Sequence, residues 1–141
     1  MAVIKVQISL STMEVNEQNL AQLRDVIERF LSPNSAAIKE AEAYMKTIET
    51  QQGFTLVLLS LIQSLSSSVA PADVAVRQTA AVIFKNAVKA RWAPEDDNVV
   101  PLPAADRPPI KAHLVDLMCT TPEGASLALS LRPLRRAYSH L

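Results

Sequence analysis

One stretch, Val74–Trp92 (VAVRQTAAVIFKNAVKARW), constrains the fold of this chain more than any other. Successive residues of an α-helix are separated by about 100° around its axis. With that spacing an apolar side forms from Val76, Ala80, Ile83, Phe84 and Ala87. The opposite side carries Gln78, Lys85 and Lys89, with Val82 among them. The stretch therefore predicts one half of a packed helix pair, with an apolar face to bury and a cationic face to present.

Four further helices are expected from the same periodicity. They cover residues 17–31, 35–51, 54–65 and 107–120. Asn16 is placed to cap the first helix, because its side chain can accept from backbone N–H groups of the first turn. The residues Ser32-Pro33-Asn34 end that helix, and Gly53 is placed to terminate the second. The 54–65 segment is apolar nearly all round, which predicts a helix covered on several sides.

The connections between these helices are also visible in the sequence. Residues 66–73 are expected to form a loop, and residues 94–103 (PEDDNVVPLP) an acidic connector. Asp106 is expected to cap the last helix. Pro108 and Pro109 then fall in the first turn, where a missing N–H group costs little.

Composition supports a helical fold for the whole chain. Its 141 residues include only two glycines, and 49% of them are hydrophobic. The helices pair in order, 17–31 with 35–51, 54–65 with 74–92, and 107–120 with the segment after residue 120. HEAT and armadillo repeats consist of two or three helices in about 40–47 residues. We therefore predict an all-α fold, a HEAT-repeat α-solenoid fragment of about two and a half helix pairs.

Charge and hydropathy argue against nucleic-acid and membrane binding. Fourteen basic and fourteen acidic residues cancel, so the chain has no overall cationic footprint. The longest apolar run, residues 54–62, falls far short of the roughly 20 residues of a membrane span. Residues 1–13 lack the features of a signal peptide, and the single cysteine is typical of a reducing compartment. We expect a soluble intracellular protein with no membrane insertion.

No catalytic or metal site is indicated. His113 and His140 lie far apart, without a neighbouring Cys or His at ligand spacing, and His113 is expected to have a structural role beside the apolar stripe of its helix. Two glycines cannot build a phosphate-binding loop, and Cys119 is expected to pack as a small hydrophobic residue. We expect no enzyme activity, no metal and no cofactor.

The central helix carries the candidates for binding. Lys85 and Lys89 share one face, which suits docking to an acidic surface, although a solvated helix face has the same spacing. Arg77 is expected to be partly buried and paired with a carboxylate of the preceding helix. Trp92 is expected to cover the core between repeats. Asn86 can hydrogen-bond either a neighbouring loop or a partner.

The same helix resembles the importin-β (karyopherin) N-terminal domain. The resemblance rests on Arg77, Ala80–Ala81, Phe84-Lys85-Asn86 and Trp92, in that order and spacing. It extends over residues 13–123, and the segment from Ala105-Asp106-Arg107 to Pro122-Glu123 is most similar to the CAS-type exportins, the branch that returns importin-α to the cytoplasm.

The resemblance implies a superhelix of HEAT repeats whose N-terminal repeats bind Ran in its GTP form. It places the Ran-facing surface on the exposed sides of the 35–51 and 74–92 helices, with Lys85, Asn86 and Lys89 as contact residues. Importin-α would be the cargo of the full-length receptor, which moves between nucleus and cytoplasm.

Two parts of the chain depart from the family. Residues 1–12 form an extension outside the resemblance, and residues 124–141 form a divergent tail in which Pro133 would break a helix. A truncated or alternatively spliced gene product is the expected explanation. The alternatives are a truncated helical scaffold fragment without productive Ran or cargo binding, and another import receptor of the importin-β family.

Overall fold

The computed structural model describes residues 12–120, of which the side chains are described up to His113. The regular elements of this part of the chain are all helices, which confirms the all-α prediction. Its elements are α2 (Glu17–Phe30), α3 (Ser35–Ile48), α4 (Phe54–Ser64), α5 (Pro71–Arg91), the 3-10 turn η1 (Ala104–Asp106) and α6 (Arg107–Thr120). The predicted extension 1–12, apart from Thr12, and the predicted tail 124–141 with His140 lie outside the described residues.

Helix starts follow the local signals of the sequence. The Asn16 side chain accepts from the backbone N–H of Asn19 at 2.8 Å, as predicted. Asn34 caps α3 in the same way, accepting from the N–H of Ala36 at 2.9 Å. Gly53 directly precedes α4 and has a φ of +92°, a left-handed conformation that glycine adopts without a steric cost. Short polar residues and one glycine thus define three of the helix starts.

The boundaries of two helices differ from the prediction by more than one residue. Helix α3 ends at Ile48, earlier than the predicted Gln51. Helix α5 begins at Pro71, so residues 71–73 are helical and not part of the predicted loop. The reason is that Pro71 occupies the first turn, where proline needs no hydrogen-bond partner, and Asp73 adds a negative charge at the positive end of the helix.

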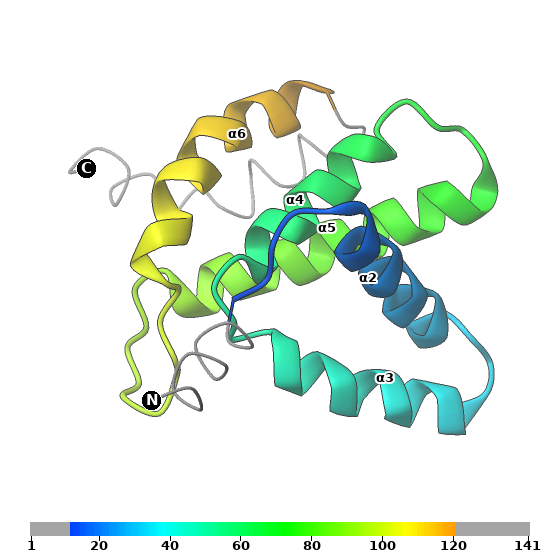
Figure 1. The fold of residues 1–141 in the computed structure, drawn as a ribbon, viewed down its shortest axis with the longest axis horizontal. Coiled ribbons are helices and arrows are strands. Elements are labelled where there is room, and N and C mark those ends of the chain that lie inside the picture. The colour runs from blue at the N-terminus through cyan, green and yellow to red at the C-terminus, as the bar shows by residue number, and fades with distance from the viewer. Residues whose placement is uncertain (1–11, 121–141) are drawn as a thin grey trace.

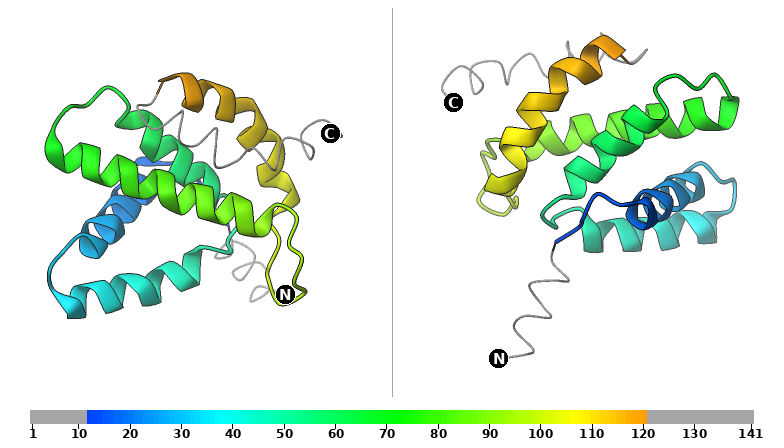
Figure 2. Two further views of the ribbon diagram at one scale, coloured as in Figure 1. Left: turned by 180° about the vertical axis from the view of Figure 1, so that it is seen from behind. Right: turned by 45° about the horizontal axis from the view of Figure 1, so that its top comes forward.

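Helix α4 is the centre of the fold (Figure 1). It packs against α2, α5 and α6, while α3 packs against α2. The helices α2 and α3 form the first pair and α4 and α5 the second, with α6 on the far side of α4 (Figure 2). The first two pairs predicted from the sequence are therefore found, and α2, α4 and α6 are stacked in a row. The predicted partner of α6 lies outside the described residues.

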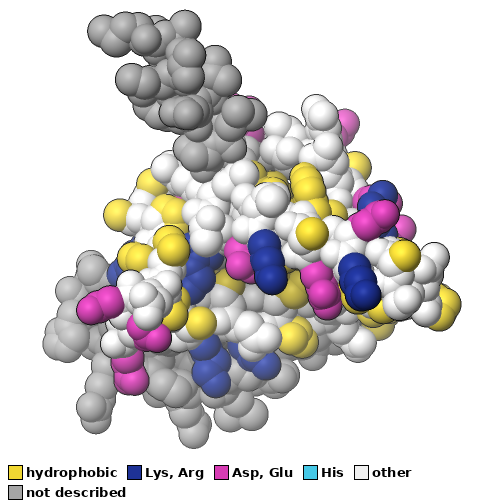
Figure 3. Space-filling view, turned by 90° about the horizontal axis from the view of Figure 1, so that it is seen from below, with side chains coloured by type: hydrophobic (Ala, Val, Ile, Leu, Met, Phe, Trp, Pro, Cys, Tyr) yellow, Lys and Arg dark blue, Asp and Glu magenta, His cyan; other side chains and the backbone are white. Residues whose placement is uncertain are grey.

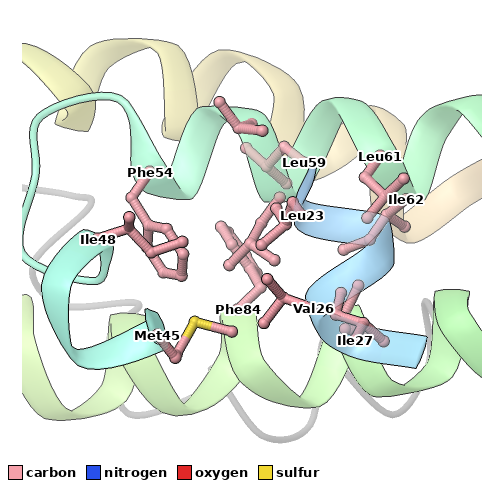
Figure 4. Close-up of a cluster of buried hydrophobic side chains, with 14 of the residues drawn as sticks. Leu23, Val26, Ile27, Met45, Ile48, Phe54, Leu59, Leu61, Ile62 and Phe84 are labelled. Carbon is pink, nitrogen blue, oxygen red and sulfur yellow. The ribbon is translucent and has the colours of Figure 1, made fainter. Parts of the chain in front are cut away.

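The hydrophobic core joins the two pairs. Buried side chains from α2, α3, α4 and α5 converge in one cluster (Figure 4), with Phe54, Ile48 and Met45 on one side and Phe84, Leu23 and Val26 on the other. Seven of the eleven α4 residues are buried: Phe54, Thr55, Val57, Leu58, Leu59, Leu61 and Ile62. The prediction that α4 is covered on several sides is confirmed.

Asp106 does not have the predicted role of capping α6. It lies in η1, and its buried carboxylate accepts from the backbone N–H of Gly53 at 2.8 and 3.0 Å and from the Thr55 hydroxyl at 3.4 Å. The carboxylate therefore stands at the start of α4, whose first-turn N–H groups have no partner within the helix. The predicted positions of Pro108 and Pro109 in the first turn of α6 are confirmed.

Within residues 12–120, no helix is long and apolar enough to cross a membrane.

Candidate partner-binding face

Helix α5 divides its residues between core and surface. Its buried side chains are Val76, Arg77, Ala80, Ala81, Phe84, Val88 and Arg91. Ala80 and Ala81 are both buried and small, so their side chains leave room for a neighbouring helix to lie close to α5. The residues of the family signature, Arg77, Ala81, Phe84 and Trp92, therefore serve the interior of the molecule.

The opposite side of α5 carries the three predicted contact residues. Asn86 and Lys89 are exposed, and Lys85 is half-buried. Val82, one turn before Lys85 and Asn86, has an exposed fraction of 49%. Neither Lys85 nor Lys89 forms an ion pair with another residue in the described part of the chain. We define Val82, Lys85, Asn86 and Lys89 as the α5 face.

A second exposed row lies on α3. Its outward side chains include Lys39, Glu42, Lys46 and Glu49, all exposed. Figure 3 shows this side of the molecule, on which basic and acidic side chains alternate along a row. We define these four residues as the α3 face. Its two positive and two negative charges balance, whereas both charges of the α5 face are positive.

Arg77 has a different partner from the one predicted. Its exposed fraction is 3%, and its Nη1 donates to the carbonyl oxygens of Leu65 at 2.8 Å and Ser68 at 3.0 Å. The prediction of a carboxylate from the preceding helix was wrong, because α4 (FTLVLLSLIQS) contains no acidic residue. Arg77 binds the carbonyl groups that come after the end of α4.

Trp92 is buried, in agreement with its predicted place over the core between repeats. The guanidinium carbon of Arg107 lies 5.1 Å from the centroid of the Trp92 ring, within the range of a cation–π contact. Trp92 thereby connects the end of α5 to the start of α6.

Two buried charged residues have roles that the sequence did not indicate. Arg91 ends α5 and is buried, and its side chain donates to three backbone carbonyls, those of Glu49, Val100 and Pro101. Burial lowers the pKa of Arg91, while the carboxylates of Glu49 and Asp106 act in the opposite direction.

Asp106 is the second of these residues. Burial raises its pKa, opposed by the hydrogen bonds from Gly53 and Thr55 and by the charge of Arg91. For Arg91, the sequence carries one signal of burial: this cation directly precedes the core residue Trp92.

A shallow hollow of about 420 Å³ lies between α2 and α3. Polar side chains at its rim contact one another: the Tyr44 hydroxyl of α3 donates to Gln22 of α2 at 3.5 Å, and Arg29 is paired with Asp25 within α2 at 3.1 Å. His113 is exposed on α6, away from the structural position expected for it beside the apolar stripe. Among residues 12–120, no three His, Cys, Asp or Glu side chains are grouped so that they could hold a metal ion.

Comparisons with known proteins agree with this arrangement. The model of the importin-beta N-terminal domain family matches residues 41–120. Exportin-2 of Oreochromis niloticus is 32% identical over 118 residues, which cover 84% of this chain and 12% of that protein. Exportin-2 of Homo sapiens is 32% identical, and that of Pagrus major 33%, with the same coverage. The chain thus spans about an eighth of the length of these relatives. No solved structure matches the chain.

Proposed function

This chain belongs to the importin-β N-terminal domain family, and on that premise we propose that it is the Ran-GTP-binding N-terminal region of an exportin-type nuclear transport receptor. Similarity to exportin-2 proteins supports the exportin branch over an import receptor of the same family. The function is that of a binding protein, in which a helical surface recognises a small GTPase and no bond is made or broken.

The observation that carries the proposal is the α5 face. Lys85 and Lys89 lie one turn apart on the second helix of a pair, and neither is neutralised within the described residues. Cations of this kind attract an acidic surface over a distance and increase the rate of association. Asn86 lies beside them on the same face and supplies both a donor and an acceptor for a specific contact.

The roles of the whole receptor are part of the same proposal. Importin-α would be its cargo, and binding of Ran-GTP and cargo would be coupled, so that each raises the affinity for the other. Such a receptor moves between nucleus and cytoplasm. Since cargo contacts in a solenoid are spread over many repeats, this chain by itself would contribute the Ran contact and little affinity for cargo.

A retention experiment tests the proposal. The chain is immobilised and exposed to Ran loaded with a non-hydrolysable GTP analogue or with GDP. We expect retention of the GTP form only, and we expect the double variant Lys85→Glu/Lys89→Glu to lose it. Raising the salt concentration should weaken the wild-type interaction, because exposed charges are screened.

A matched variant controls for net charge. Lys39→Glu/Lys46→Glu reverses two exposed lysines of the α3 face and changes the net charge by the same amount. A smaller loss with this variant would show that the α5 face contributes more to the contact than the α3 face does. Equal losses would contradict the leading role proposed for the α5 face. A wild-type chain that is helical by circular dichroism and retains neither form of Ran would contradict the proposal.

The alternative function is a helical scaffold without productive Ran binding. The observation that favours it is the coverage of 12% of the exportin-2 sequence, since most of the repeats of such a receptor are outside this alignment. The same experiment separates the two functions.

A further inference from the structure

Helices α3 and α5 form a V. Figures 1 and 2 show that their C-terminal ends lie close together, whereas their N-terminal ends lie far apart. Helix α2 contacts both of them and fills the space between the two arms. The α3 face and the α5 face are therefore carried by two arms that meet at one end, and the angle between the arms determines how far apart the faces lie.

Arg91 lies where the arms meet. It is the last residue of α5, and its Nη1 donates to the carbonyl of Glu49, the residue directly after α3. Its Nε donates to Val100 at 2.7 Å and its Nη2 to Pro101 at 3.4 Å, both carbonyls of the 94–103 connector. One side chain thus joins the second helices of both pairs and the segment that leads to the third.

The connector returns a bond of its own to this residue. The N–H of Leu102 donates to the backbone carbonyl of Arg91 at 2.9 Å, and the Leu102 side chain is buried. Asp106, four residues further on, binds Gly53 in the turn between α3 and α4. The turn after α3 is therefore held from two sides, by Arg91 and by Asp106.

Only a guanidinium can make this set of contacts. It is planar and rigid and offers five N–H donors directed to separate acceptors. The lysine ammonium is a compact group on a flexible stem, and it is not shaped to hold three carbonyls from two separate segments. Hydrogen bonds from a charged donor are also stronger than those from a neutral one. A buried charged donor that is left without an acceptor is costly.

We propose that Arg91 is a positioning residue for the partner-binding surface: it fixes the angle between α3 and α5 and thereby the spacing of their exposed faces. The part of this inference that concerns binding rests on the function proposed above. The part that concerns the angle between the helices does not.

The angle is tested by a distance measurement between two spin labels. They are attached to cysteines introduced at Lys39 on α3 and Gln78 on α5, both exposed and both on the open side of the V, after replacement of Cys119 by Ser. We expect a single narrow distance distribution for the otherwise native chain. In the Arg91→Lys variant we expect a broader and shifted distribution.

Two further variants make this test decisive. Pro101→Gly loosens the connector carbonyls and leaves the Arg91 side chain and the core residues unchanged. It should broaden the distribution in the same sense if Arg91→Lys does not fold. Arg24→Lys is the matched control. Arg24 of α2 forms an ion pair with Asp73 of α5 at 2.6 Å. Arg24→Lys therefore weakens a contact between two helices but leaves the contacts between Arg91 and Glu49 in place. An unchanged distribution in both Arg91→Lys and Pro101→Gly overturns the proposal.

Binding is then measured with Ran carrying a GTP analogue, at a temperature where every variant is fully folded. We expect the Kd of the Arg91→Lys chain to rise about tenfold and that of the Arg24→Lys chain to stay within twofold of the wild type. A changed distance with an unchanged Kd would overturn the positioning role. A native chain that does not bind Ran would contradict the proposed function, and the distance measurement would still decide whether Arg91 sets the angle.

Discussion

The carboxylate of Asp106 and the backbone N–H of Gly53 are joined by hydrogen bonds of 2.8 and 3.0 Å, although 52 residues of chain lie between them. The contact ties the segment before α6 to the turn before α4. It supplies the start of α4 with an acceptor, which matters because Gly53 has no side chain with which to cap the helix. A residue from the beginning of the third unit therefore completes the first helix of the second.

Removing this acceptor should destabilise the chain. In Asp106→Ala the buried N–H of Gly53 loses its partner, and an unsatisfied buried donor costs about 1–3 kcal/mol. We expect the free energy of unfolding to fall by about 2 kcal/mol in urea denaturation. Asp106→Asn keeps one oxygen acceptor and should lose about half as much. An Asn variant less stable than the Ala variant would contradict this account.

The pH dependence of stability should carry the signature of Asp106. Burial raises its pKa above the usual 3.8, so the folded chain binds this proton more tightly than the unfolded chain does. As the pH falls through the raised pKa toward 3.8, this group therefore stabilises the folded state, and the gain is lost again as the pH rises through the raised value.

The difference in unfolding free energy between the wild type and Asp106→Asn isolates that contribution. We expect the wild type to gain on the variant as the pH is lowered in this window, and the difference to be constant at neutral pH. Hydrogen bonds from Ser68 and Arg24 lower the pKa of Asp73, so its contribution to stability changes with pH in the opposite direction. Because Asp73 is present in both chains, its contribution cancels in the difference. A difference that moves the other way would show that the carboxylate is better stabilised in the fold than in water.

Gly53 should tolerate no side chain. Its φ of +92° is strained for other residues, and a Cβ atom built on it would lie 2.0 Å from the carbonyl oxygen of Met13. The N–H of Met13 in turn donates to the carbonyl of Gln52 at 2.7 Å, so the extended segment around Met13 has little freedom to retreat. Left-handed backbone alone costs about 1–2 kcal/mol, and we expect Gly53→Ala to lose at least about 2 kcal/mol of unfolding free energy.

A second substitution at the same position separates the two causes. Asn adopts positive φ more readily than Ala but carries the same Cβ. Equal losses in Gly53→Asn and Gly53→Ala would assign the cost to the contact with Met13, and a smaller loss for Asn to the backbone. An Ala variant whose stability lies within roughly 0.5 kcal/mol of the wild type, the spread of neutral surface substitutions, would refute the prediction.

The sequence predicted the features that depend on neighbouring residues. The cap by Asn16 and the burial of α4 on several sides are encoded in patterns within one or two turns of helix. The placement of Asn86 and Lys89 on the outside of α5 results from the helical period in the same way. Whether these residues bind Ran is a separate matter, and that part of the interpretation stays a prediction.

Contacts between distant segments were not predictable. Asp106 has the residue type and the position of an ordinary helix cap. Nothing near it in the sequence identifies Gly53 as its partner. Arg91 adjoins Trp92 at the end of a helix, and its acceptors are backbone carbonyls, which any sequence could supply. The incorrect prediction of a carboxylate partner for Arg77 has the same cause. A sequence shows which side chains can accept a hydrogen bond, but it does not show which backbone carbonyls will lie within reach.

Arg77 offers the clearest test of that distinction. Its guanidinium binds the carbonyls of Leu65 and Ser68 at 2.8 and 3.0 Å in a buried setting, and hydrogen bonds to a charged group are worth about 1.5–3 kcal/mol each. Arg77→Met keeps an apolar stem but has no donor, and we expect a loss of about 3 kcal/mol in urea denaturation. Arg77→Lys retains a charged donor for one of the carbonyls and should lose roughly half as much. If Arg77→Met were as stable as the wild type, these two bonds would contribute no net free energy, and the end of α4 would be held by packing alone.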